Sequence, residues 1–244
     1  MELKENERID DLQLKGLKII QNKNGFCFGI DAVLLSDFAK QIKENSVVVD
    51  LCSGNGIIPI LLCGKTAASK IYGVEIQEEV SELAKRSVCL NHLEDRIEIV
   101  NRDLKEIKDV IPSGSVDAVT VNPPYMKKGS GIINERDTKT IARHEISCTL
   151  EDIIKEAARV LKFGGSLYMV HKTERLVDVL SCMRKEKVEP KRLRFIHPSF
   201  GEAPNLFLVE GVRSGNSFLK IEPPLYVYED KENYTKEIKE IYHL

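Results

Sequence analysis

A β-branched strand, a glycine-rich turn and a helical run follow one another early in the chain. Ser46 to Leu51 contains three consecutive valines, Cys52 to Gly56 contains two glycines, and Ile57 to Leu62 is apolar. Because glycine accepts positive φ and has no Cβ, such a turn lets a ligand lie against main-chain N–H groups at the helix start. A dinucleotide-binding turn carries a third glycine where this chain has Pro59, so the turn suits a smaller cofactor.

The alternation of strands and helices continues along the chain and predicts a mostly parallel sheet with helices on both faces. Further strands are expected at 71–75, 97–100, 116–121, 166–170, 192–197 and 206–212, and helices at 31–40, 77–91, 150–161 and 173–187. Residues 198–205 are too few for a crossover helix, so the last two strands should be antiparallel. Asn24-Gly25 lies between 17–21 and 26–28, which predicts an N-terminal hairpin.

Acidic residues stand at the ends of three successive predicted strands. Asp50 and Glu75 end the first two, and Asp103 follows the third. The interval from Asp50 to Glu75 fits one strand–helix–strand step, as ribose recognition by an acidic residue requires. Taken singly, each acid could be an exposed or capping carboxylate. Together they predict a ligand with several hydrogen-bond donors.

Asn122-Pro123-Pro124-Tyr125 ends another apolar run, Val116 to Val121. A planar amino nitrogen is a poor nucleophile because its lone pair is delocalised, so it must be held in place. The Asn122 side-chain oxygen and the Pro123 carbonyl can accept its N–H bonds, the prolines stiffen the loop, and Tyr125 offers a face for stacking. In isolation the same residues could simply close a strand, with the tyrosine capping the core.

Together these motifs resemble class I S-adenosylmethionine-dependent methyltransferases that act on amino groups, and more narrowly the bacterial valine-tRNA adenine methyltransferase group. The resemblance runs almost end to end and is carried by Phe26 to Leu35, Asp50 to Gly56, Asn122 to Tyr125, Ala142 to Glu145, Glu210 to Gly215 and Pro223 to Leu225. It implies an α/β fold with a Rossmann-like, seven-stranded, mostly parallel sheet and an antiparallel last strand. Residues 1–40 would form a hairpin and helix packed on a methyltransferase domain of residues 41–244.

The resemblance also implies S-adenosylmethionine as cofactor and assigns roles to residues. The cofactor would be held by Asp50, Ser53, Gly54, Asn55, Gly56, Glu75 and Asp103, with Gly29 and Asp31 as candidates near its methionine end. The reacting amine would be held by Asn122, Pro123, Pro124 and Tyr125. His144 could serve as a base, but methyl transfer to an amino nitrogen depends more on positioning than on a base of matched pKa.

The implied substrate is an adenine of tRNA, in the anticodon loop, methylated on its exocyclic amino group. A net charge of −2 provides no overall attraction to RNA, so any RNA surface must be local. Two basic segments, 127–143 and 184–194, supply the candidates Lys127, Lys128, Arg136, Lys139, Arg143, Arg192 and Arg194. Each segment could instead be a solvated charged face, the second more readily than the first.

Other substrates remain open because related enzymes with an Asn-Pro-Pro-aromatic loop methylate guanine in ribosomal RNA or a glutamine in release factors. The small N-terminal region, in place of a separate helical recognition domain, argues against the protein substrate. A non-catalytic RNA-binding protein on the same fold is a further alternative, against which the intact Asn122 loop argues.

The composition of the chain limits the classes of protein to which it can belong. With 42% hydrophobic residues, a chain of 244 residues can bury the core of one α/β domain. Six cysteines without Cys-x-x-Cys or Cys/His spacing predict neither a metal site nor a disulfide framework. No apolar segment approaches the ~20 residues needed to cross a membrane, so a cytoplasmic protein is expected.

Overall fold

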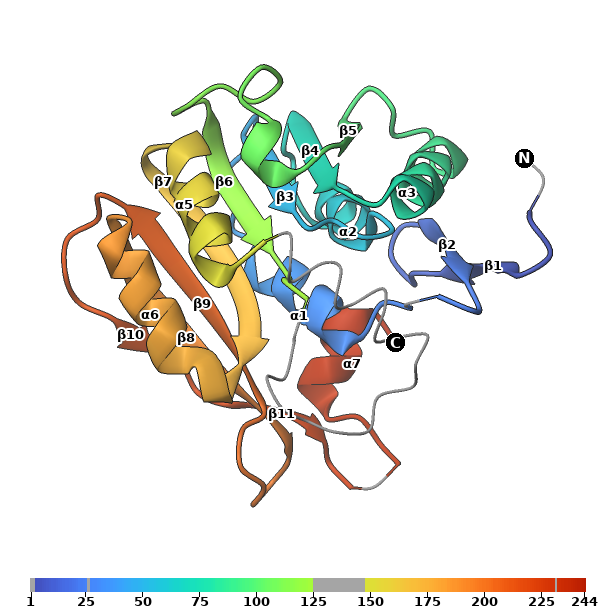
Figure 1. Cartoon of the computed structure of the whole chain (residues 1–244). Helices are drawn as coiled ribbons and strands as arrows, with labels where there is room; N and C mark the ends of the chain where they lie inside the picture. Colours follow the sequence, from blue (N-terminus) through green and yellow to red (C-terminus); the bar gives the residue numbers. More distant parts are fainter. Residues whose placement is uncertain (1–2, 26, 125–147, 231) are drawn as a thin grey trace, which may run out of the picture.

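A central nine-stranded sheet dominates the computed structural model, which describes residues 3–25, 27–124, 148–230 and 232–244 (Figure 1). Its strand order is β10-β8-β9-β7-β6-β3-β4-β5, and β11 also pairs with β8. The strands are β3 (Val47–Leu51), β4 (Lys70–Glu75), β5 (Ile97–Asn101), β6 (Val116–Val121), β7 (Leu161–Lys172), β8 (Val188–Ser199), β9 (Leu206–Arg213), β10 (Lys220–Ile221) and β11 (Leu225–Tyr228).

The seven strands β3 to β9 confirm the predicted sheet. Neighbours among β3, β4, β5, β6 and β7 are parallel, and β9 runs antiparallel to both β7 and β8. The short strands β10 and β11, which were not predicted, extend the β8 edge in parallel. β7 begins at Leu161, directly after the preceding helix, and thus upstream of the predicted residue 166.

Helices cover both faces of the sheet, as the strand–helix alternation predicts. They are α1 (Ile30–Phe38), α2 (Ile57–Lys65), α3 (Glu78–Leu90), α5 (Leu150–Val160), α6 (Leu176–Lys185) and α7 (Lys236–Tyr242), with 3-10 turns η1 (Leu104–Glu106) and η2 (Thr173–Arg175). One core cluster joins α1, α2, α3 and α7 to one face, and a second joins α5 and α6 to the other. Successive residues of β3 enter the two clusters in turn: Val48 belongs to the first and Val49 to the second.

The N-terminal hairpin exists, but its predicted strands were wrong. β1 (Glu7–Asp11) pairs antiparallel with β2 (Lys18–Asn22), so the turn lies in residues 12–17 and not at Asn24-Gly25. Gln13, Lys15 and Gly16 adopt positive φ in that turn. Asn24-Gly25 instead follows β2, where the Gly25 N–H donates to the Asn22 carbonyl at 3.0 Å.

Side chains of α3 and of Asn91, the residue that caps its C-terminal end, hold the hairpin through three contacts with β1 and β2. Arg86 forms an ion pair with Glu7 at 2.6 Å. The Ser87 hydroxyl accepts from the Ile20 N–H at 3.1 Å, and the Asn91 amide bonds both the N–H and the carbonyl of Lys18. The hairpin is thereby tied to the helix that follows β4.

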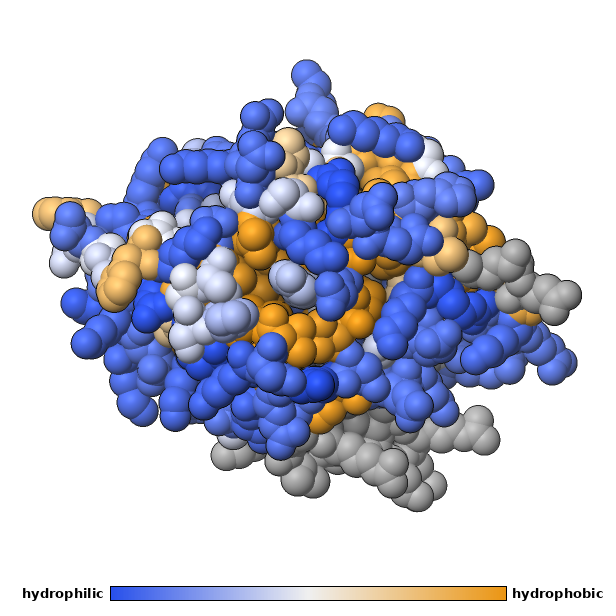
Figure 2. All heavy atoms as spheres, turned by 90° about the horizontal axis from the view of Figure 1, so that it is seen from above, coloured by the Kyte–Doolittle hydropathy of each residue, from blue (hydrophilic) through white to orange (hydrophobic). Residues whose placement is uncertain are grey.

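The surface seen from above carries hydrophilic side chains over most of its area, with hydrophobic atoms showing between them near the middle (Figure 2). Within the described ranges, no helix has the length and apolar character that a membrane span requires.

Candidate active site

The carboxyl ends of four neighbouring strands, β6, β3, β4 and β5, form one edge of the sheet. Register places Asp50 of β3 opposite Thr120 of β6 on one side and Gly73 of β4 on the other. Glu75, at the end of β4, is opposite Asn101 of β5. The acids predicted at strand ends thus lie along a single edge, as parallel strands require.

The turn between β3 and α2 depends on its glycines. Gly54 and Gly56 adopt φ of 57° and 82°, in the left-handed region that glycine tolerates. A Cβ on Gly56 would lie 3.3 Å from the Cβ of Ala84, so α3 packs directly against the turn. The turn therefore carries main-chain N–H groups to the start of α2, where a polar ligand can approach them.

Glu75 is almost fully buried and, from the end of β4, holds the turn of residues 52–56, which is called the cofactor turn below. Its Oε2 accepts the Gly54 N–H at 2.9 Å, and its Oε1 accepts the Gln77 N–H at 2.9 Å. One carboxylate therefore links the glycine turn to the start of α3. Its remaining lone pairs can accept the hydroxyl donors of a ribose.

Asp50 is fully buried, and its two oxygens differ. Oδ1 accepts the Thr120 hydroxyl at 2.6 Å, whereas Oδ2 has no hydrogen-bond partner among the described residues. Burial raises the pKa of Asp50 to about 7, assisted by the negative charge of Glu75 and opposed by the neighbouring hydroxyls of Thr120 and Ser53. A buried carboxylate oxygen without a partner is rare, and it matches the ammonium group of an amino-acid ligand.

Further buried polar atoms without partners surround the turn. Besides Asp50 Oδ2, they are Ser53 Oγ, Asn55 Nδ2 and Ser81 Oγ in the described part of the chain. Three of the four belong to the segment from Asp50 to Gly56. Since buried polar groups are normally paired, this cluster fits a polar cofactor such as S-adenosylmethionine, which offers an ammonium, a carboxylate, a ribose diol and an adenine.

Asp103, Gly29 and Asp31 make local contacts with their own segments of the chain. Asp103 caps η1 by accepting the Lys105 N–H at 3.0 Å, and it is partly exposed. Gly29 precedes α1, and the buried Asp31 accepts the Ala32 N–H at 3.0 Å. Across the described ranges, none of the three shares a hydrogen bond with Asp50 or Glu75. Their part in holding the cofactor stays a prediction.

Asn122, Pro123 and Pro124 follow β6 at the same edge. Val121 pairs with Leu51, so Asn122 stands one residue beyond that pair, beside the cofactor turn. Asn122 is half-buried, Pro123 is buried and Pro124 is exposed. Tyr125 and His144 lie outside the described residues, as do the RNA candidates Lys127, Lys128, Arg136, Lys139 and Arg143.

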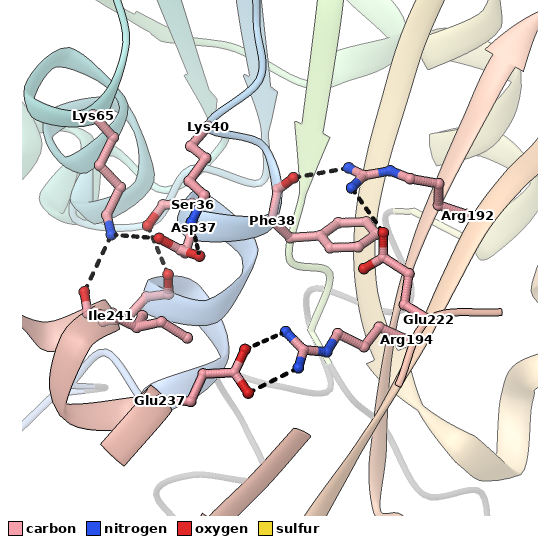
Figure 3. Close-up of polar contacts among 11 residues, drawn as sticks. Ser36, Asp37, Phe38, Lys40, Lys65, Arg192, Arg194, Glu222, Glu237 and Ile241 are labelled. Carbon is pink, nitrogen blue, oxygen red and sulfur yellow. Dashed lines mark hydrogen bonds and ion pairs between the residues drawn. The ribbon is translucent and has the colours of Figure 1, made fainter. Parts of the chain in front are cut away.

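Arg192 and Arg194 occupy a different environment from the open basic face expected for them (Figure 3). Arg192 pairs with Glu210 and with Glu222, donates to the Phe38 carbonyl at 3.0 Å, and lies over the Phe38 ring. Arg194 pairs with Glu237 at 2.8 Å and donates to the Pro223 carbonyl. Both side chains are only 18% exposed. These guanidinium groups hold the C-terminal segment on the sheet, so the prediction that they face RNA finds no support.

Thr120 is a polar residue of this site that the sequence analysis did not identify. Thr120 is the only hydroxyl residue in the apolar run Val116 to Val121. A polar side chain inside a buried strand requires a partner, and this signal could have pointed to Thr120. Its partner, Asp50, is 70 residues earlier in the chain and is visible only once the strands are paired.

Two bacterial relatives resemble this chain over most of its length. The tRNA1(Val) (adenine(37)-N6)-methyltransferase of Porphyromonas gingivalis is 27% identical over 206 residues, which cover 82% of this chain and 80% of the relative. The protein of the same name from Bacteroides thetaiotaomicron is 24% identical and covers 94% of both chains.

Solved structures share the fold. A protein of Agrobacterium tumefaciens described as a predicted O-methyltransferase superposes with a TM-score of 0.69 at 19% identity, covering 87% of this chain and 95% of that one. TYW2 of M. jannaschii in complex with AdoMet has a TM-score of 0.58 at 17% identity and covers 87% of each chain. The family model for the methyltransferase small domain matches residues 29–186, which include the cofactor turn and the Asn122 loop. The chain therefore belongs to the methyltransferase small domain family, as an S-adenosylmethionine-dependent methyltransferase.

Proposed function

We propose that this enzyme methylates the exocyclic N6 amino group of an adenine in tRNA, within the anticodon loop. The observation that carries the proposal is the position of Asn122 and Pro123, which directly follow Val121, the residue of β6 that pairs with Leu51 next to Asp50. The relatives from P. gingivalis and B. thetaiotaomicron, both named for adenine-37 of tRNA1(Val), support the choice of substrate.

Cofactor binding is assigned to the buried polar groups around the turn. Asp50 Oδ2 takes the ammonium of the methionine moiety, Glu75 takes the ribose hydroxyls, and main-chain groups from Ser53 to Gly56 line the rest. Asp103 is placed at the adenine, with Gly29 and Asp31 near the methionine end. When bound, S-adenosylmethionine supplies an electrophilic methyl group on its sulfonium.

Catalysis follows from alignment of the adenine amine by the Asn122 loop. The Asn122 oxygen and the Pro123 carbonyl accept the two N–H bonds of the amine and orient its lone pair toward the methyl group. Their dipoles would stabilise the positive charge that develops on the nitrogen as it takes the methyl group, while the methyl–sulfur bond breaks and leaves a neutral thioether; the nitrogen would then pass one proton to water. Tyr125 is assigned as the stacking partner of the base, which must leave its loop to reach the site.

The proposal is tested by separating binding from chemistry with Asn122→Ala. We expect the variant to bind S-adenosylmethionine with nearly the affinity of the wild type, because Asn122 is assigned to the substrate. Turnover on unmodified tRNA should fall by ~100-fold or more, as the removal of a positioning and electrostatic interaction causes. Wild-type turnover by the variant would contradict the role of Asn122.

A further inference from the structure

Asp50 and Thr120 form a buried pair across the centre of the sheet. They are opposite residues of β3 and β6, both fully buried, and parallel pairing directs their side chains to the same face. The Thr120 hydroxyl lies 2.6 Å from Oδ1, a distance typical of an O–H group that donates to a carboxylate. Thr120 has no catalytic or cofactor role in the function proposed above.

The other neighbour of Asp50 leaves room for the Ser53 hydroxyl. Gly73 of β4 has no side chain, and a Cβ there would lie 2.8 Å from the Ser53 hydroxyl. Ser53 Oγ and Asp50 Oδ2 both lack a hydrogen-bond partner within the described ranges. Thr120 therefore holds one of the two carboxylate oxygens, and the other is left without a hydrogen-bond partner in the described chain.

We propose that Thr120 is a positioning residue for the cofactor: its hydroxyl orients the Asp50 carboxylate so that Oδ2 receives the ammonium of S-adenosylmethionine. The inference rests on the cofactor role of Asp50 in the proposed function. The hydroxyl also favours the charged form of Asp50, against the burial that disfavours it. A protonated Asp50 could not pair with an ammonium group.

The charged surroundings of Asp50 make this hydroxyl important. Glu75 at the end of β4 is a like charge that raises the pKa of Asp50. Cys52 directly follows β3, and its thiol stays neutral because burial raises its pKa. The residue of β6 opposite Asp50 is Thr120, which carries no charge. The hydroxyl of Thr120, and to a smaller extent that of Ser53, thus opposes both burial and the Glu75 charge.

The test compares Thr120→Val, which removes the hydroxyl and keeps the shape, with Thr120→Ser, which keeps the hydroxyl. Calorimetric titration would measure S-adenosylmethionine affinity from about pH 5 to 7.5, where the ammonium stays mostly protonated. We expect Thr120→Val to weaken binding about tenfold near pH 6.5 and to lose half of its maximal affinity at a higher pH than the wild type. Thr120→Ser should keep the wild-type pH profile.

A second ligand distinguishes positioning from a general structural effect. 5′-Methylthioadenosine lacks the ammonium and carboxylate of the methionine moiety, so Thr120→Val should bind it as the wild type does. Thr66→Val is the matched control, because it removes a threonine hydroxyl that bonds the Leu62 carbonyl at the far end of α2. It should leave both ligands and the pH profile unchanged.

Two results would overturn the inference: an unchanged pH profile in Thr120→Val, or equal weakening of both ligands. Asp50→Asn separates this failure from failure of the proposed function. If Asp50→Asn weakens S-adenosylmethionine binding but Thr120→Val behaves as the wild type, only the positioning role is wrong. If Asp50→Asn has no effect on binding, the assignment of Asp50 to the cofactor is itself wrong.

Discussion

Asp50 destabilises the folded protein when no cationic partner is bound. Its carboxylate has no exposure to solvent, and one of its oxygens has no hydrogen-bond partner in the described chain. Burying a charge in this way is unfavourable unless a partner is supplied. The ammonium of the cofactor supplies such a partner, so the group that destabilises the free protein is the one assigned to binding.

The pH dependence of stability should reveal this cost through Asp50→Asn. Burial raises the pKa of Asp50 from 3.8 to about 7, so the folded state keeps the proton to a higher pH than the unfolded chain. This contribution to stability is complete below the unfolded pKa and is lost as pH rises through about 7. Without cofactor, the Asn variant should gain about 1–3 kcal/mol in free energy of unfolding at pH 8, relative to the wild type.

Urea denaturation at pH 8 and at pH 4 would measure this difference. At pH 4 the folded wild type already carries a neutral Asp50, so the gain of the Asn variant should largely disappear. Two results would contradict this account of Asp50. One is an Asn variant that is less stable than the wild type at pH 8; the other is a gain in free energy of unfolding that is the same at pH 4 as at pH 8.

At the scale of elements, the N-terminal hairpin depends on α3 for its position. The Glu7 and Arg86 side chains are only 4% and 16% exposed, and two guanidinium nitrogens reach the two carboxylate oxygens. This hydrogen bonding from Arg86 lowers the pKa of Glu7. Since α3 also packs against Gly56, the hairpin and the cofactor turn contact the same helix.

Arg86→Met should leave the buried Glu7 carboxylate without a cationic partner, with only the Lys4 N–H donating to it, and destabilise the protein by about 2–4 kcal/mol. The double variant Glu7→Gln with Arg86→Met should lose less than the two single variants together, because it leaves no unpaired charge. Urea denaturation gives the free energies, and hydrogen exchange shows whether amides of β1 and β2 lose protection first. Additive losses would contradict a direct coupling of these side chains.

Local patterns predicted most elements but could not supply their long-range partners. The three valines and the glycine turn identify β3 and α2 because strand and turn preferences act over a few residues. The hairpin was misplaced because Asn24-Gly25 is a strong turn signal, whereas the actual turn uses Gln13 and Lys15 at positive φ. Gly16, which also adopts positive φ in that turn, is a weaker turn signal than Asn24-Gly25.

The same limit applies to the basic segment 184–194. Arg192 and Arg194 stand in a basic segment, yet their acidic partners Glu210, Glu222 and Glu237 lie 18 to 43 residues further along. Charge counted along the chain therefore overestimated the basic surface. The carboxylates at strand ends were predicted well, because parallel strands bring their carboxyl ends to one edge whatever the loops between them.

At the scale of the whole molecule, the binding of tRNA by a chain of net charge −2 requires a local basic surface. With Arg192 and Arg194 engaged in ion pairs, segment 127–143 is the stronger candidate for phosphate contacts. Arg184 and Lys185 form the end of α6, and the Arg184 side chain is 67% exposed. They provide a matched pair of basic residues at the amino edge of the sheet, away from Asn122.

We predict that Lys127→Ala with Lys128→Ala weakens the binding of unmodified tRNA and leaves cofactor affinity intact. Removing one phosphate-binding side chain should reduce the slope of log affinity against log salt by about 1. Arg184→Ala with Lys185→Ala removes the same charge and should leave the slope unchanged. Fluorescence anisotropy over a salt series measures both variants. Equal slopes in the wild type and the Lys127/Lys128 variant would remove this segment from the RNA surface.

The central claim is that the Asn122 loop presents an adenine of tRNA to the methyl donor, and methyl transfer into tRNA tests it most directly. The purified enzyme, S-adenosylmethionine labelled in its methyl group and unmodified tRNA would be incubated, and the RNA digested to nucleosides for mass spectrometry. We predict that the label appears as N6-methyladenosine, in a fragment that contains the anticodon loop. Label in guanosine, or transfer to release factor with none to RNA, would contradict the claim.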